Sequence, residues 1–147
     1  MNGFSVELTG LQAVMERLSS FGRNVMQGVD DEMDAAAENI AGNAREDCPV
    51  GDGKGGSGLR QSISVNRDGP LQKSVVANKF YAPYVEFGTG DYAAEYVQTL
   101  PEEIQAYAMT FYVNGKGHMP AAPFMFPNVV KEQPLLIERI KQVIKDA

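Results

Sequence analysis

The feature that most constrains the fold of this chain is a run of apolar residues spaced three and four positions apart. The run consists of Val25, Met26, Val29, Met33, Ala36, Ile40 and Ala44. This spacing places the side chains on one face of a helix, so it predicts a long amphipathic α-helix. The helix should end near Asp47, because Pro49 disfavours helical geometry in the residue before it. A similar run over 11–18 predicts a shorter helix, divided from the long one at 19–22.

Alternating apolar and polar residues predict the strands. The predicted strands are 4–8, 59–65, 71–77 and 110–113. In the first of them, Phe4, Val6 and Leu8 alternate with polar residues, as in a half-buried strand. A cluster of turn-forming residues at 66–70 joins the second strand to the third, which predicts a β-hairpin.

Helical patterns continue in the second half of the chain. Short helices are predicted over 80–88 and 101–107, the first ended by a glycine and the second opened by a proline. Apolar residues recur at helical spacing over 136–144. Pro127 and Pro134 interrupt this C-terminal region, so two helical pieces are expected there.

Length and composition indicate one α+β domain over 1–147. A chain of 147 residues with 44% hydrophobic residues can build a real core. The predicted elements give a small, mostly antiparallel sheet packed against a long N-terminal helix, with a C-terminal helix. The net charge of −6 disfavours a domain that binds nucleic acid through its phosphates. No signal peptide or membrane-spanning stretch is visible, which indicates a cytoplasmic origin.

The sequence gives no pattern for a metal or cofactor. Cys48 and His118 are the only cysteine and histidine, so an intramolecular disulfide is impossible and zinc or haem sites are disfavoured. The glycine-rich stretch 50–58, which we expect to be a flexible loop, resembles a phosphate-binding loop. However, Lys54 is followed by Gly55 where that motif needs Ser or Thr. We therefore expect no cofactor.

Glu86 is the residue that most resembles a catalytic group. It lies among aromatic residues, and such surroundings can raise the pKa of a carboxyl so that it acts as an acid or base. The sequence places no second catalytic group beside it. A structural or interface ion pair is therefore favoured for Glu86, and we expect no enzymatic activity.

A basic island lies within an otherwise acidic chain. Between residues 54 and 79, five cations are accompanied by a single acid, Asp68. The cations are Lys54, Arg60, Arg67, Lys73 and Lys79. Complementarity to an acidic protein neighbour or to another subunit is favoured over a nucleic-acid patch.

Four segments together resemble a known family. They are Cys48-Pro49, Gly58-Leu59-Arg60-Gln61-Ser62-Ile63, the stretch YAPYVEFGT from Tyr81 to Thr89, and Ala122-Pro123-Phe124-Met125. Their order and content are similar to the neck or minor tail-component family (head–tail joining, tail completion) of long-tailed double-stranded DNA bacteriophages and prophages. The YVEFGT block is the most specific part. The motif positions, which are also the candidate interface residues, are Gly58, Leu59, Ser62, Ile63, Tyr81, Tyr84, Glu86, Phe87, Gly88, Thr89, Pro123 and Phe124. Relative to the family pattern, 90–118 resembles an insertion.

The resemblance implies a non-enzymatic structural protein of the virion, located at the head–tail junction after assembly in the host cytoplasm. It implies a ring of six or twelve copies through which DNA passes. The implied partners are further copies of the chain, the head connector or head-closure proteins, and the tail terminator or tail tube proteins. DNA would be contacted only in passing, and no membrane is involved.

Three alternatives remain open from the sequence. The protein could be a tail terminator or head-closure ring protein, which belongs to the same structural class. It could instead be a small enzyme that uses Glu86, or a DNA-binding accessory protein that uses the basic island.

Overall fold

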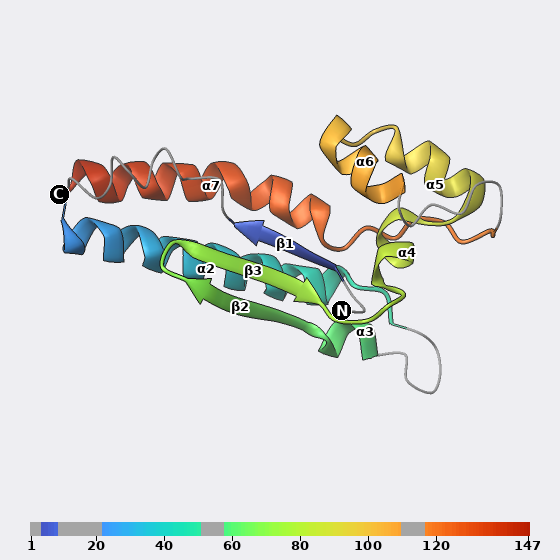
Figure 1. Ribbon diagram of the computed structural model, residues 1–147, viewed down its shortest axis with the longest axis horizontal. Coiled ribbons are helices and arrows are strands. Elements are labelled where there is room, and N and C mark those ends of the chain that lie inside the picture. Colours follow the sequence, from blue (N-terminus) through green and yellow to red (C-terminus); the bar gives the residue numbers. More distant parts are fainter. Residues whose placement is uncertain (1–3, 9–21, 51–57, 110–116) are drawn as a thin grey trace.

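A three-stranded antiparallel sheet forms one layer of the molecule (Figure 1). The residues described by the computed structural model are 4–8, 22–50, 58–109 and 117–147. The strands are β1 (Phe4–Leu8), β2 (Ile63–Gly69) and β3 (Gln72–Ala77), in the spatial order β1-β3-β2. In the central strand β3, Val75 lies opposite Val6 of β1 and Val65 of β2. The strand predicted at 4–8 is therefore confirmed.

Two long helices form the second layer. They are α2 (Arg23–Asp47) and α7 (Phe126–Lys145). The shorter helices are α3 (Gly58–Gln61), α4 (Ala82–Phe87), α5 (Gly90–Val97) and α6 (Glu102–Met109). Helix α2 packs on the sheet, and α7 runs antiparallel beside α2 (Figure 1). The short helices α4, α5 and α6 lie at the end of the molecule where α7 begins. This arrangement confirms the predicted α+β fold.

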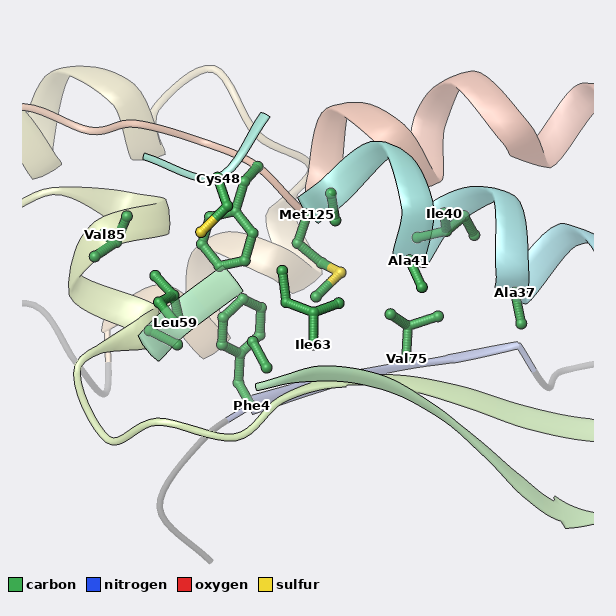
Figure 2. Close-up of a cluster of buried hydrophobic side chains, with 14 residues drawn as sticks. Phe4, Ala37, Ile40, Ala41, Cys48, Leu59, Ile63, Val75, Val85 and Met125 are labelled. Atoms are coloured by element: carbon green, nitrogen blue, oxygen red, sulfur yellow. The ribbon is translucent and has the colours of Figure 1, made fainter. Parts of the chain in front are cut away.

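Helix α2 is buried on two sides, which explains its long apolar stripe. Toward the sheet it presents small residues such as Ala37 and Ala41, so the helix comes close to Phe4 and Val75 (Figure 2). Toward α7 it presents larger residues, and Met33 joins a second buried cluster with residues of α7. The helix ends at Asp47, as the following proline predicted.

Polar side chains also join α2 to α7. Arg139 of α7 binds Glu32 of α2 at 2.8 Å and Glu132 of its own helix at 2.7 Å. Glu132 in turn accepts a hydrogen bond from Asn39 of α2 at 3.1 Å. At the other end of the pair, Asn128 donates to Asp47 at 2.9 Å. These bonds fix the register between the two helices as well as their contact.

The hairpin is confirmed, but its first strand is displaced from the predicted range 59–65. Residues 58–61 form a helical turn instead, which is closed by a 2.6 Å hydrogen bond from the Ser62 hydroxyl to the Leu59 carbonyl. Strand β2 then continues through the polar residues predicted to form the turn. Those residues suit a strand because Asn66 is exposed, Arg67 binds acids on α2, and Asp68 accepts a hydrogen bond from Ser74 of β3. The reversal comes at Pro70 and Leu71.

The C-terminal region is one helix, so the prediction of two pieces is wrong. Pro127 lies in the first turn of α7, where a missing N–H costs nothing. Pro134 lies inside the helix, on its exposed side. Pro134 cannot donate a hydrogen bond to the carbonyl of Val130, but packing of the opposite face keeps the helix continuous.

Helix α5 was not predicted, although its sequence contains apolar residues at helical spacing. Ala93 and Val97 are buried at a spacing of four, with Tyr96 partly buried beside them. The helix predicted at 101–107 is confirmed as α6. The helix expected over 11–18, most of the glycine-rich loop and the strand expected over 110–113 lie outside the described residues.

Candidate functional site

The stretch YAPYVEFGT (residues 81–89), which we refer to as the central motif, contains a buried carboxylate that holds the start of helix α7. Glu86 lies in α4 with none of its surface exposed. Its Oε2 accepts the backbone N–H groups of Phe124 at 2.7 Å and Met125 at 2.9 Å, and its Oε1 accepts that of Phe126 at 2.9 Å. Amides at a helix start have no partner within the helix. Glu86 therefore caps α7 from a distant part of the sequence.

The electrostatics of Glu86 reflect two opposed effects. Burial raises the pKa of the carboxyl above 4.5, its usual value, because a charge is costly away from water. The three backbone N–H groups lower it, since they stabilise the charged form, but they offset only part of the rise. The positive end of the α7 dipole also lies beside the carboxylate, which suits a negative charge there.

Backbone hydrogen bonds extend this contact to both sides of Glu86. The N–H of Thr89 donates to the carbonyl of Met119 at 2.9 Å, and the Thr89 hydroxyl accepts the N–H of Met119 at 2.9 Å. The N–H of Ala122 donates to the carbonyl of Val85 at 2.8 Å. We refer to residues 85–89 and the segment 119–126 that they bind as the motif clamp.

Gly88 permits the close approach of the two chains in the motif clamp. Its φ of +80° lies in the left-handed region that favours glycine. A Cβ at this position would lie 2.8 Å from the backbone nitrogen of Ala121 and 3.0 Å from the carbonyl oxygen of Met119. Both neighbours are backbone atoms, so neither can move aside without breaking the hydrogen bonds around it.

Aromatic rings of the motif connect the clamp to the sheet. Phe87 and Phe124 are both buried, and both lie against Phe4 of β1, with ring centroids 6.3 and 6.1 Å apart respectively. Phe126 lies 5.9 Å from Phe87. The clamp thus brings α4, α7 and β1 together around one group of rings.

The motif segment that precedes the hairpin, residues 58–63, also makes contacts within the protomer. Leu59 and Ile63 are buried in the cluster that contains Phe4 (Figure 2). The Ser62 hydroxyl closes the turn before β2 and accepts the N–H of Asn78. A Cβ at Gly58 would lie 3.5 Å from the Tyr81 hydroxyl, so this segment packs directly against the central motif.

The remaining motif residues lie nearer the surface. Tyr81 packs against the main core from just before α4. Tyr84 and Pro123 are partly exposed, and Pro123 lines a shallow cavity beside α5. Of the motif positions, these are more available to a neighbouring protein than Leu59, Ile63, Phe87 or Phe124. Their role as interface residues stays a prediction.

The structure spreads the basic island over several environments. Lys73 is buried and binds Asp30 of α2 at 2.9 Å. Arg67 binds Asp34 at 2.8 Å and Glu38 at 3.2 Å. For these two cations, α2 of the same chain supplies the acidic complement that the sequence led us to expect from a neighbour.

The other three cations of the basic island are not drawn together. Arg60 donates to the carbonyl of Cys48 at 3.1 Å, and Lys79 is exposed. Lys54 lies outside the described residues. The island is therefore not one continuous cationic surface across the residues that the structure describes.

The surroundings of Glu86 do not suit a reacting group. Both oxygens of Glu86 are bound to backbone N–H groups, and the buried carboxylate has no contact with solvent. Within the described residues, no three His, Cys, Asp or Glu side chains are arranged to hold a metal ion. Cys48 is buried and its pKa is raised by burial, while His118 is exposed. None of the helices in the described ranges is long and apolar enough to cross a bilayer.

Comparison with known proteins identifies one family. Residues 12–88, just over half of the chain, match the family model described as "Bacteriophage HK97-gp10, putative tail-component". The match covers α2, the hairpin and α4, and it ends at Gly88. No curated protein and no solved structure matches the chain. The family match confirms the resemblance seen in the motifs.

Proposed function

Since this chain belongs to the HK97-gp10-like family of bacteriophage tail components, we propose that it is a non-enzymatic protein of the head–tail junction. Family membership makes it a tail-related structural component of the virion. In the proposed role, six or twelve copies form a ring that joins the head connector and head-closure proteins to the tail terminator and tail tube. DNA passes through this ring.

The observation that carries the proposal is the use of Glu86 in the motif clamp. Glu86 is the charged residue of the family's most specific motif, and within the described residues its hydrogen bonds go to backbone amides of the same chain. A reacting carboxylate must be able to touch its substrate. The motif therefore supports an architecture that holds α7 in place, as expected of a structural protein.

The distribution of charge supports passage of DNA without binding. The net charge is −6, and Arg67 and Lys73 are held by acids of α2. Cations engaged in this way contribute little to phosphate binding. A channel built from such subunits would repel the DNA backbone and let it slide.

The proposal is tested by deleting the gene from the parent phage or prophage and viewing the lysate by electron microscopy. We expect DNA-filled heads beside unattached or malformed tails. Complementation with the intact gene should restore whole particles. Normal, infectious virions from the deletion strain would overturn the proposal.

The same lysates distinguish the related structural roles. Filled heads with complete, unattached tails favour the joining role, whereas tails of abnormal length favour a tail terminator. Heads that have lost their DNA favour a head-closure protein. Salt-dependent binding of the purified protein to duplex DNA would instead favour the DNA-binding accessory alternative.

A further inference from the structure

The outer face of helix α7 carries an apolar stripe that is exposed within the described residues. Val130, Pro134 and Ile137 follow one another at steps of four and three, on the side opposite the residues packed against α2. Val130 is 63% exposed and Ile137 is 45% exposed. Contiguous apolar side chains on the surface commonly mark a contact with another protein. We refer to Val130, Pro134 and Ile137 as the α7 stripe.

Positive charge surrounds the α7 stripe. Lys131, Lys141 and Lys145 are exposed on the same helix. Glu138 is exposed there as well, but it is paired with Lys141 at 3.4 Å. Within the described parts of the chain, no ion pair engages Lys131 or Lys145. The stripe is therefore an apolar surface with cationic edges.

A surface of opposite charge lies beside α5, at the end of the molecule where α7 begins. A shallow cavity of about 370 Å³ opens between α5 and the extended segment before α7. Its lining includes Tyr92, Glu95, Tyr96, Thr99, Pro120 and Pro123. Tyr92 is 46% exposed. We refer to this cavity as the α5 groove.

The α5 groove lies in a part of the chain that carries acids but no cations. The sequence has no lysine or arginine between Lys79 and Lys116. Asp91 and Glu95 are exposed on one face of α5, and Glu102 and Glu103 are exposed on α6. The groove thus combines exposed aromatic surface with negative charge, which complements the apolar and cationic α7 stripe.

We infer that the α5 groove of one copy binds the α7 stripe of the next copy. Within one protomer the two surfaces cannot meet, because α7 runs away from α5 along the length of the molecule (Figure 1). Contact between two different patches is heterologous, so a bound pair still has one free groove on one copy and one free stripe on the other. Such contacts close into a ring when the rotation per copy allows it. The inference deepens the proposed function and rests on it.

Cross-linking tests which surfaces meet. Thr99→Cys places a thiol at the α5 groove, and Pro134→Cys places one on the α7 stripe; the native Cys48 is buried and protected. With a short bismaleimide, a mixture of the two variants should give cross-linked dimers, and either variant alone should give none. A chain that carries both changes should give a ladder of oligomers. Ala35→Cys, at an exposed site of α2 outside both surfaces, is the matched control.

The pattern of cross-links decides the result. Dimers between two Thr99→Cys chains or between two Pro134→Cys chains would indicate a symmetric contact and overturn the inference. It would also be overturned if no mixed product formed, either at high concentration of the purified protein or in assembled particles. Cross-links from the stripe to a different virion protein would mean that another partner occupies it.

Charge reversal gives an independent measurement. Glu95→Lys and Lys131→Glu should each weaken self-association roughly fivefold, because each places like charges across the contact. The double variant should recover most of the loss, since it restores opposite charges. Arg23→Glu makes the same change of charge at an exposed site outside both surfaces and should leave association unchanged. A double variant that is weaker than both single variants would contradict the pairing.

These tests separate the inference from the proposed function. If the deletion strain lacks joined particles but groove and stripe do not cross-link, the junction role stands and the subunit contact lies elsewhere. If groove and stripe cross-link but the deletion strain makes normal virions, the contact stands and the junction role fails.

Discussion

The Oε2 atom of Glu86 lies 2.7 Å from the backbone nitrogen of Phe124, which is 38 residues further along the chain. This single contact joins the family's most specific motif to the start of the last helix. It explains why a carboxylate occurs among aromatic residues, where a charge would otherwise be costly. The carboxylate replaces the solvent that the first amides of α7 would need.

Replacement of Glu86 by Gln should destabilise the protein. The amide oxygen can still accept hydrogen bonds, but the amide nitrogen is a donor and would face a backbone N–H. We expect a loss of about 1–3 kcal/mol in the free energy of unfolding, the usual effect of leaving a buried donor unpaired. Urea denaturation followed by circular dichroism measures this. Glu95→Gln, at an exposed site on α5, is the matched control and should have little effect. Equal stability of the two variants would contradict the capping role.

The pH dependence of the free energy of unfolding should show the titration of Glu86. Burial raises its pKa above 4.5 in the folded state, so the folded protein holds this proton when the unfolded chain has released it. Stability contributed by Glu86 is therefore fully present below pH 4.5 and is lost as the pH rises through the raised pKa. The unfolding free energy of the wild type minus that of Glu86→Gln should fall over this range.

Subtraction of the variant removes the titration of the other carboxyls. A difference that grows with pH would mean that the three amides outweigh burial and hold the pKa of Glu86 below its usual value.

Gly88→Ala should prevent the motif clamp from closing properly. The added methyl group would lie 2.8 Å from a backbone nitrogen, and the residue would keep a φ of +80° that alanine rarely adopts. We expect a loss of roughly 2 kcal/mol or more in the free energy of unfolding. Gly42→Ala provides the matched control. Gly42 lies inside helix α2, and a Cβ at this position would meet no packing neighbour within 4 Å among the described residues. That variant should gain roughly 0.5–1 kcal/mol. Destabilisation of similar size in both variants would contradict the steric account.

Local patterns were enough to predict much of the fold. The spacing of apolar residues in α2, the alternation in β1 and the turn residues of the hairpin act between near neighbours in the chain. Pro134 misled the prediction, because the packing of Leu136 and Ile140 against α2 outweighs one missing hydrogen bond. The cost of a proline depends on which face it occupies, and that is a property of the tertiary structure.

The candidate site could be located from the sequence, but its role could not. The motif block around Glu86 is recognisable as a string of residues. Its partners are backbone amides of Phe124 to Phe126, and backbone groups have no sequence signature. The same limit applies to Arg67, whose acidic partners on α2 lie 29 or more residues earlier in the chain. Contacts between residues this far apart in the sequence can be identified only in the folded molecule.

Asp30→Asn should destabilise the protein, because it leaves the buried ammonium group of Lys73 without its counter-charge. Lys73 is almost fully buried, and its ammonium group lies 2.9 Å from Oδ1 of Asp30, which also accepts the N–H of Leu71 at 2.8 Å. Asparagine can keep the bond to Leu71 but leaves Lys73 without its counter-charge. Because Asp30 is partly exposed, we expect a loss of about 2–3 kcal/mol, below the full effect for a deeply buried pair. Glu38→Gln, at the exposed partner of Arg67, should change stability by only about 0.5 kcal/mol.

The pH dependence of Asp30 should have the opposite sign to that of Glu86. Burial acts to raise the pKa of Asp30, but the Leu71 N–H, Lys73 and Arg67 together hold it below 3.8, its usual value. The unfolded chain therefore binds this proton first, and the stability contributed by Asp30 is lost as the pH falls below 3.8. The free energy of unfolding of the wild type minus that of Asp30→Asn should shrink over this range. A constant difference would contradict the lowered pKa of Asp30 and its role as the counter-charge of Lys73.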